Sequence, residues 1–326
     1  PDAGLGGTRH PFCRTPGDRC FPTVRIFANF TRGDSGKIAR FVALTVEPED
    51  TLDLLVAGDS ESYNSVSTMR LWEDKGIAAY DCGQGAQRIP ETYYMLKQGF
   101  KGQSPKIVML ETNTLFRDIG AVKSTQAILE QMGQYYLPVF RYHNLWKTAV
   151  DEPKIHTNYK GFVIRDEVAP YEGKPDYMKK KKKCETMPKY VKIYLEKIEE
   201  LCEKNNAQLL LVSMPSPKNW NHKRHAEMQQ YADEKGIAYL DLNEKVEELG
   251  LNWAEDTQDK GDHLNVYGAE KVTSYLGNYL EDNYELEDHR NDPAYEAWNQ
   301  LAEQYEQNLA KTRGEIEVAK ETGVEK

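Results

Sequence analysis

Short apolar runs recur along the middle of this chain, and segments with helical spacing separate them. One such segment, residues 187–203, places Val191, Leu195 and Ile198 on one face of a helix. Short apolar runs are typical of buried strands, and strands that alternate with helices favour a parallel sheet. We therefore predict an α/β fold around a mainly parallel five-stranded sheet. Its strands are expected at residues 52–57, 77–80, 106–110, 209–212 and 237–242.

The first part of the chain lacks this alternation. Residues 1–50 are rich in Gly, Arg, Pro and Thr, and we interpret them as an N-terminal arm with short strands at 24–30 and 41–46. Cys13 and Cys20 lie in this arm. They could form a disulfide in an oxidising compartment, but the five cysteines of the chain are an odd and scattered set. The cysteines therefore leave the redox compartment open.

The main domain is expected over residues 51–280, with a helical insertion at about 116–188 between its third and fourth strands. Such an insertion could cover a site, although its lysine run favours a solvated loop. Residues 281–326 are acidic and have a helical period. We expect this C-terminal tail to pack back onto the domain through its first half and to fray beyond it.

Charge and composition exclude some classes of function. The chain has 42 basic and 52 acidic side chains, which gives a formal net charge of −10. This charge repels a phosphate backbone, so we expect no nucleic-acid partner. The sequence shows neither strong metal-ligand spacing nor a run approaching the roughly 20 apolar residues that cross a bilayer. Because the chain begins at Pro1, a preceding leader or anchor is compatible with it.

Polar or glycine residues follow three of the predicted strands. Ser60 follows the first strand, Gly85 or the less favoured Gly83 follows the second, and Asn113 follows the third. Ligands bind outside the carboxyl ends of parallel strands. A serine there can act as a nucleophile, while a glycine N–H and an asparagine amide can donate to an oxyanion. The three positions converge on one edge of the predicted sheet, and the prediction of a site depends on a fourth element.

A histidine follows far along the chain. His263 lies just before a predicted helix, with Asp259 and Asp262 beside it. A histidine and a carboxylate are what a general base and its orienting group require. Asp259 can reach the imidazole through a turn that contains Gly261. Asp262 is closer, but adjacent side chains in extended backbone point apart, so both assignments stay open.

With these four elements in this order, the chain resembles the SGNH hydrolase family, also called GDSL-like, whose blocks contribute Ser, Gly, Asn and His. The matching residues are Ser60, Gly85, Asn113 and His263. The family usually places its aspartate three residues before the histidine, where this chain has Lys260.

The resemblance spans about residues 51–280. It looks closest to a membrane-associated branch of Gram-positive bacteria that includes the lipoteichoic acid D-alanylation protein and polysaccharide O-acetyltransferases, and residues 215–220 are among the features that suggest this branch. Short-spaced variants in it give Asp262 a slight preference over Asp259. A second departure is Glu111, where the family commonly has glycine.

The resemblance implies a flavodoxin-like three-layer α/β/α sandwich and serine-dependent acyl-ester hydrolysis or acyl transfer, without metal or cofactor. Ser60 is the expected nucleophile and His263 its base. The N–H groups of Ser60 and Gly85 and the Asn113 amide are the expected oxyanion hole. The implied partners are an acylated carbohydrate or cell-wall polymer and a membrane-bound acyl donor. The implied location is the extracellular face of the cytoplasmic membrane, with the anchor missing from this chain.

Two other functions are compatible with the same pattern. The irregular aspartate spacing also suits a catalytically silent carbohydrate-binding or scaffold protein with this fold. Nucleotide binding at a flavodoxin-like switch point is disfavoured, because no glycine-rich fingerprint follows a strand. In the insertion, Trp146, Tyr159 and Phe162 could stack on sugar rings, although core packing is favoured for each taken singly.

Overall fold

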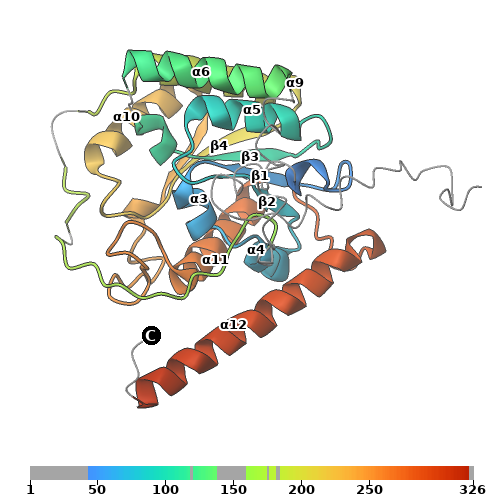
Figure 1. Ribbon diagram of the computed structural model, residues 1–326, viewed down its shortest axis with the longest axis vertical. Helices are drawn as coiled ribbons and strands as arrows, with labels where there is room; N and C mark the ends of the chain where they lie inside the picture. The colour runs from blue at the N-terminus through green and yellow to red at the C-terminus, as the bar shows by residue number, and fades with distance from the viewer. Residues whose placement is uncertain (1–42, 118–119, 138–158, 175, 181–183, 323–326) are drawn as a thin grey trace, which may run out of the picture.

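Five parallel strands form one sheet at the centre of the molecule (Figure 1). The structure is a computed structural model that describes residues 43–117, 120–137, 159–174, 176–180 and 184–322. The strands are β1 (Leu54–Ala57), β2 (Ala79–Asp81), β3 (Ile107–Glu111), β4 (Gln208–Ser213) and β5 (Ala238–Asp241). Each falls on one of the five apolar runs, so the predicted α/β fold is confirmed.

The order of the strands is β2-β1-β3-β4-β5. Leu54 of β1 is in register with Ala79 on one side and with Ile107 on the other. β2 therefore lies on one side of β1, and β3, β4 and β5 follow in turn on the other side, which is the flavodoxin-like order. In such sheets the crevice for a ligand opens at the carboxyl ends of the two strands where the order reverses, here β1 and β3.

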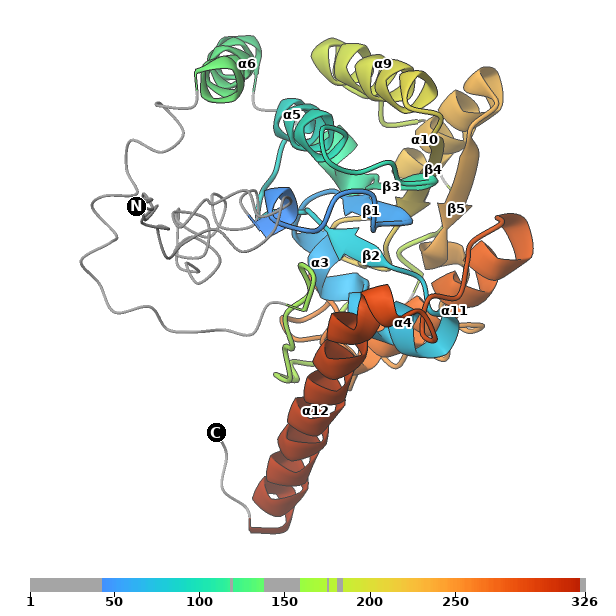
Figure 2. The same cartoon turned by 90° about the vertical axis from the view of Figure 1, so that its right-hand side faces the viewer.

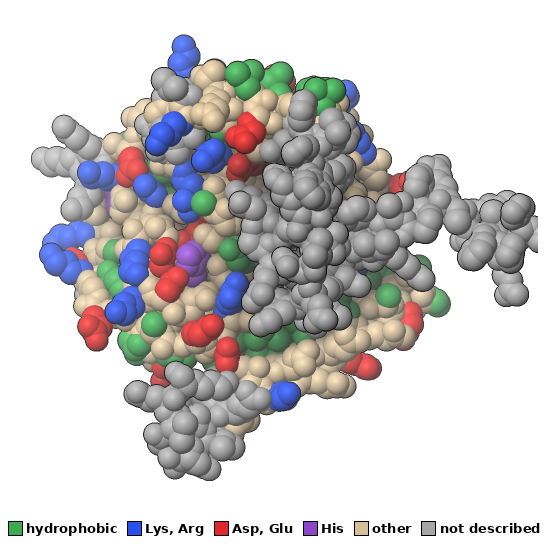
Figure 3. Space-filling model, in the orientation of Figure 1, with side chains coloured by type: hydrophobic (Ala, Val, Ile, Leu, Met, Phe, Trp, Pro, Cys, Tyr) green, Lys and Arg blue, Asp and Glu red, His purple; other side chains and the backbone are tan. Residues whose placement is uncertain are grey.

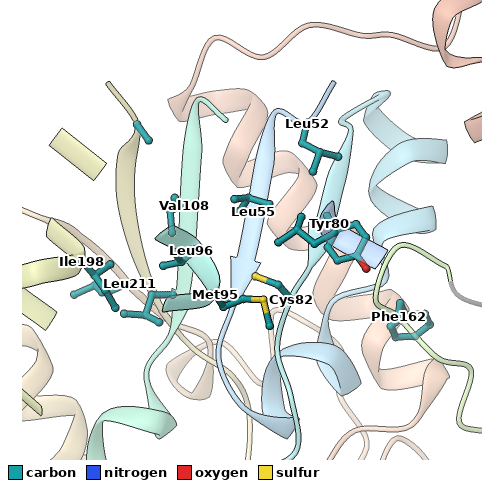
Figure 4. Packing of buried hydrophobic residues seen from close by; sticks show 14 of the residues in the cluster. Leu52, Leu55, Tyr80, Cys82, Met95, Leu96, Val108, Phe162, Ile198 and Leu211 are labelled. Atoms are coloured by element: carbon teal, nitrogen blue, oxygen red, sulfur yellow. The ribbon is translucent and has the colours of Figure 1, made fainter. Parts of the chain in front are cut away.

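Helices cover both faces of the sheet, so the domain is a three-layer sandwich (Figure 2). On one face lie α5 (Ile89–Gly99), α9 (Lys189–Lys204) and α10 (His222–Lys235), and on the other α4 (Thr68–Lys75) and α11 (Val266–Asn283). Side chains alternate along each strand. Leu55 and Val108 pack with Leu96 of α5 and Ile198 of α9 (Figure 4), whereas Leu54 faces α4 and α11.

The start of α11 is fixed by one side chain. Asn265 caps the helix because its Oδ1 accepts hydrogen bonds from the backbone N–H groups of Tyr267 and Gly268, at 3.1 and 3.2 Å. Its Nδ2 donates to the carbonyl oxygen of Glu255 at 2.6 Å. The helix therefore begins at a set point three residues after His263, which ties that residue to the body of the domain.

The insertion contributes one described helix, α6 (Ala121–Tyr136), which lies against α5 (Figure 2). Tyr159 and Phe162, expected as sugar-stacking candidates, are 3% and 1% exposed and pack edge-on against Tyr305. They belong to the core, so the favoured core packing is confirmed for both and the alternative stacking role is wrong. The third candidate, Trp146, lies outside the described residues.

The acidic tail is helical, as its period predicts. A short 3-10 turn, Pro293–Tyr295, leads into α12 (Glu296–Thr322), which runs along α4 and then away from the sheet (Figure 1). The buried residues of this helix are Trp298, Ala302, Tyr305 and Leu309. The Trp298 ring packs at a tilt against Trp72 of α4, with ring centroids 5.1 Å apart. The first half of α12 is thus part of the domain core.

The expectations for the N-terminal arm are only partly covered by the structure. Residues 43–45 are helical, so the strand expected at 41–46 is wrong in its described part. The other expected strand, at 24–30, lies outside the described residues, and so do Cys13 and Cys20.

Acidic and basic side chains are interspersed on the face of the molecule seen in Figure 3. Within the described parts of the chain, no helix combines the length and the apolar composition needed to cross a membrane.

Candidate active site

Ser60 lies where β1 gives way to the short helix α3 (Ser60–Ser65). Asp59 caps this helix, with its Oδ1 accepting a hydrogen bond from the Glu61 N–H at 2.9 Å. Gly58 is required just before it, because a Cβ there would come within 2.5 Å of the Cβ of Glu111 on β3. The Gly-Asp-Ser sequence therefore closes β1 against β3 and places the serine hydroxyl at the carboxyl edge of the sheet.

Ser60 and His263 meet at this edge. The distance from Ser60 Oγ to His263 Nε2 is 2.8 Å, and from His263 Nδ1 to Asp259 Oδ2 it is 2.5 Å. A carboxylate accepts hydrogen bonds only, so Nδ1 carries the imidazole proton. Nε2 is then the acceptor for the Ser60 hydroxyl, which is the geometry of a nucleophile with its general base.

The loop before α11 explains why the partner is Asp259. Lys260 and Gly261 have φ angles of +65° and +84°, and these two left-handed residues turn the chain back on itself. Asp259 therefore comes beside His263 and also accepts a hydrogen bond from the His263 backbone N–H at 2.6 Å. The turn through Gly261 that the sequence allowed is present. The slight preference for Asp262 has to be reversed.

Asp262 makes a different contact. Its Oδ1 accepts a hydrogen bond from Asn219 Nδ2, and the same amide nitrogen donates to Glu61 Oε1 at 2.5 Å. Oxygen atoms of Glu61 and Asp262 and a ring nitrogen of His263 lie within 4.8 Å of one another, a spacing that could admit a cation. The Asn219 amide already bridges the two carboxylates, so this grouping needs no metal to hold it together.

The side chain of Asn113 also lies at the edge. Asn113 begins a 3-10 turn, Asn113–Phe116, directly after β3. Its Nδ2 donates to Asp59 Oδ2 at 3.2 Å, and its Oδ1 accepts from Arg224 Nη1 at 2.9 Å. An amide has two N–H groups, and this contact with Asp59 uses one of them. The structure thus places the Asn113 amide against the residue that precedes Ser60.

The two glycines after β2 are not equivalent. The Gly83 N–H donates to Asp81 Oδ1 at 2.7 Å, and a Cβ on Gly83 would come within 2.0 Å of Ser62 Oγ. Gly83 therefore serves the packing of α3 against β2. Gly85 is exposed, and the nearest atom to a Cβ built there is the Tyr63 hydroxyl at 3.5 Å. Of the two, only Gly85 has room for a substrate beside its backbone.

Buried carboxylates surround the start of α3. Burial raises the pKa of Glu61 well above its usual range, and the nearby charges of Asp59 and Glu111 act in the same direction. Burial likewise raises the pKa of Glu111, again with the charge of Asp59 adding to the effect. Asp59 is held by Arg117, with Nε 2.5 Å from Oδ2. Burial therefore favours the neutral forms of Glu61 and Glu111, while the Arg117 guanidinium pairs with the Asp59 carboxylate.

Sequence reasoning missed three residues that organise this site. Glu61, Asn219 and Arg224 connect the serine loop, the histidine loop and the asparagine through hydrogen bonds. The only sequence signal was the stretch at residues 215–220, which contains Asn219 and follows β4. Nothing in a linear pattern indicates that a side chain on α10 reaches the end of β3.

Comparison with known proteins adds little to this geometry. No protein-family model and no curated protein matches the chain. Among solved structures it is similar to a GDSL-like lipase from Bacteroides thetaiotaomicron, with 12% identity, a TM-score of 0.40, and coverage of 78% of this chain and 98% of the other. It is also similar to an acetyl xylan esterase from the rumen bacterium Butyrivibrio proteoclasticus, with 11% identity, a TM-score of 0.33, and coverage of 72% and 65%. Both names describe ester-cleaving enzymes. TM-scores this low support no inference about this chain, so its function is argued from the site.

Proposed function

We propose that this protein is a serine-dependent esterase or acyltransferase that works through an acyl-enzyme on Ser60. The observation that carries the proposal is the continuous hydrogen-bonded chain from Ser60 Oγ to His263 Nε2 at 2.8 Å and from His263 Nδ1 to Asp259 at 2.5 Å. A serine hydroxyl is a weak nucleophile unless a base removes its proton. These hydrogen bonds place His263 as the base and hold its imidazole in the required tautomer.

In the first step, His263 Nε2 takes the Ser60 proton while Oγ attacks the carbonyl carbon of an ester. The carbonyl oxygen becomes an oxyanion. When this tetrahedral intermediate collapses, the bond to the alcohol oxygen breaks, and the imidazolium gives its proton to the leaving alcohol. Asp259 stabilises the imidazolium through its carboxylate. The acyl group is then esterified to Ser60.

The oxyanion needs preorganised donors. We assign this role to the N–H groups of Ser60 and Gly85 and to the second N–H of the Asn113 amide. Support comes from the exposed backbone of Gly85 and from the contact between Asn113 and Asp59, which keeps the amide nitrogen on the serine side. Donors of this kind are worth about 3 to 4 kcal/mol each in the barrier.

The second step decides between hydrolysis and transfer. His263 removes a proton from an incoming hydroxyl, whose oxygen attacks the acyl carbonyl, and Ser60 leaves and regains its proton. Water as the acceptor gives hydrolysis, and a sugar or polyol hydroxyl gives acyl transfer. The two outcomes differ in how well the site excludes water and holds the acceptor.

For the natural substrate we propose an O-acylated carbohydrate polymer of the cell envelope, with acetyl or a similar small acyl group. The support is the sequence resemblance at the four blocks and at residues 215–220. The same resemblance supports an extracellular location and a membrane-bound partner that supplies the acyl group.

A fluorophosphonate probe tests the nucleophile directly, because it reacts with activated serines. We expect covalent labelling of the wild-type protein and none of Ser60→Ala. Ser274→Ala, which removes a hydroxyl on α11 that bonds to Asp74 at 2.8 Å, is the matched control and should label normally. Wild-type protein that is folded by circular dichroism but does not label would contradict the proposal.

The acyl group and the acceptor can be sought with the same pair of proteins. We expect wild type, but not Ser60→Ala, to release p-nitrophenol from p-nitrophenyl acetate. Parallel assays with acetyl and D-alanyl esters, with and without oligosaccharide acceptors, then separate hydrolysis from transfer. Acylated sugar products that depend on Ser60 would identify a transferase.

A further inference from the structure

Arg224 on α10 is clamped on several sides. Its Nη1 donates to Asn113 Oδ1 at 2.9 Å and to the backbone oxygen of Asn219 at 2.6 Å, and its Nε donates to Glu185 Oε1 at 2.9 Å. The guanidinium carbon lies 5.1 Å from the centre of the Phe116 ring. The side chain is only 21% exposed. A guanidinium held in this way has little freedom to move.

One consequence concerns which way the Asn113 amide faces. A terminal amide can turn over and exchange the positions of its oxygen and nitrogen. Arg224 can only donate and the Asp59 carboxylate can only accept, so both neighbours require the oxygen toward Arg224 and the nitrogen toward Asp59. The positive charge at the oxygen end also polarises the amide, which makes its N–H groups stronger donors.

A second consequence concerns the histidine side of the site. The Arg224 guanidinium fixes the backbone of Asn219, and the Asn219 amide holds both Glu61, next to the nucleophile, and Asp262, next to the base. One cation therefore connects the end of β3 with both the serine loop and the histidine loop.

We propose that Arg224 is a positioning residue for acyl transfer, which fixes and polarises the Asn113 amide so that an N–H faces the developing oxyanion. The inference rests on the proposed function of Ser60. Arg224 contacts Asn113 through the oxygen end of the amide, so it acts on the transition state through Asn113. Its removal is expected to lower kcat more than it raises KM, because the oxyanion forms only after substrate is bound.

The test is a double-mutant cycle with p-nitrophenyl acetate. Arg224→Gln alone should lower kcat about 10- to 100-fold, less than the loss of a whole oxyanion donor, with KM nearly unchanged. In the Asn113→Ala background, the same substitution should lower kcat by much less than it does with Asn113 present, because the Asn113 amide is gone and only the contact with the Asn219 backbone remains. Arg70→Gln, which removes another partly buried arginine on α4, is the control and should leave kcat unchanged.

The outcomes separate this inference from the proposed function. Activity that survives Ser60→Ala overturns both. If Ser60→Ala is inactive but Arg224→Gln keeps the wild-type kcat, only the positioning role is overturned. The same holds if the fold-losses in kcat of Arg224→Gln and Asn113→Ala multiply in the double variant. Should Arg224→Gln not fold, Arg224→Lys replaces it in the cycle. Lysine keeps the charge but is a point donor, so Arg224→Lys should retain part of the wild-type kcat when Asn113 is present. In the Asn113→Ala background, the kcat values with arginine and with lysine at position 224 should be nearly equal.

Discussion

The Asp259 carboxylate contacts His263 twice, once at ring Nδ1 at 2.5 Å and once at the backbone N–H at 2.6 Å. One oxygen therefore sets the tautomer of the imidazole while the other sets the position of its backbone. The Asp259 side chain therefore both orients the imidazole and holds the loop that carries it. A substitution at Asp259 is expected to disturb both.

Asp259→Asn should lower kcat by about 10³- to 10⁴-fold, because an amide can donate to Nδ1 and favour the wrong tautomer. Asp262→Asn should cost much less, since Asp262 bonds to Asn219 rather than to the imidazole. Steady-state hydrolysis of p-nitrophenyl acetate measures both. A greater loss in Asp262→Asn than in Asp259→Asn would return the orienting role to Asp262.

Gly261→Ala should impair activity by disturbing the turn that delivers Asp259. Gly261 has a φ of +84°, and a Cβ there would come within 2.7 Å of Tyr171 and 2.8 Å of Pro217. Gly250→Ala is the matched control, because Gly250 also has a positive φ, +63°, but faces open space. Both substitutions carry the backbone cost of about 1 kcal/mol. We expect only Gly261→Ala to lower kcat, and equal kcat in the two variants would show that the turn tolerates the collision.

Asn113→Ala should lower kcat by about 10²- to 10³-fold with little change in KM, which is the signature of a donor that acts on the oxyanion. The affinity for a boronic acid that mimics the tetrahedral intermediate should fall in parallel. An Asn113→Ala variant in which KM rises while kcat is unchanged would assign Asn113 to substrate binding. Circular dichroism checks that the variant keeps the secondary structure of the wild type.

The docking of α12 on α4 should depend on pH. Burial raises the pKa of Glu73 on α4 from its usual 4.5 to about 8, with the neighbouring Glu306 carboxylate on α12 acting in the same direction and Arg70 opposing it. The folded state therefore keeps a proton that the unfolded state releases. The contribution of this group to stability is full below about pH 4.5 and is lost as the pH rises to about 8.

Urea denaturation at pH 5, 7 and 9 measures this effect, followed by the tryptophan fluorescence to which Trp298 on α12 contributes. The wild type should lose stability relative to Glu73→Gln as the pH rises, because glutamine keeps the neutral form at every pH. Glu281, which pairs with Lys75 at the surface, provides the control substitution Glu281→Gln. Parallel curves for wild type and Glu73→Gln would show that the Glu73 proton is not retained.

The fold was accessible from the sequence because it depends on local patterns. Each of the five apolar runs became a strand, and the residues that follow β1 and β3 lie at the carboxyl edge as predicted. The helix over residues 187–203 is observed as α9. Core packing was the favoured role for Tyr159 and Phe162, but their partner Tyr305 was not predicted, because no local pattern brings this residue of α12 near the insertion.

Only some residues of the candidate site could be predicted from local sequence patterns. Ser60 and His263 stand out by their place at element ends. The choice between Asp259 and Asp262 depends on two consecutive positive φ angles, and a lysine at the first of them gives no such signal. Arg224 and Asn219 act across the sheet edge through contacts between loops. The finer substrate, partner and location stay predictions from the resemblance.

His263 follows Ser60 by 203 positions in the sequence, and this separation has a consequence for the newborn chain. During synthesis the proposed nucleophile leaves the ribosome long before its proposed base, so on this mechanism a nascent or truncated polypeptide carries an ordinary, unreactive alcohol. On the proposed mechanism, reactivity arises only when the loop before α11 has folded against the start of α3. Labelling by an electrophilic probe would therefore mark molecules that have finished both translation and folding.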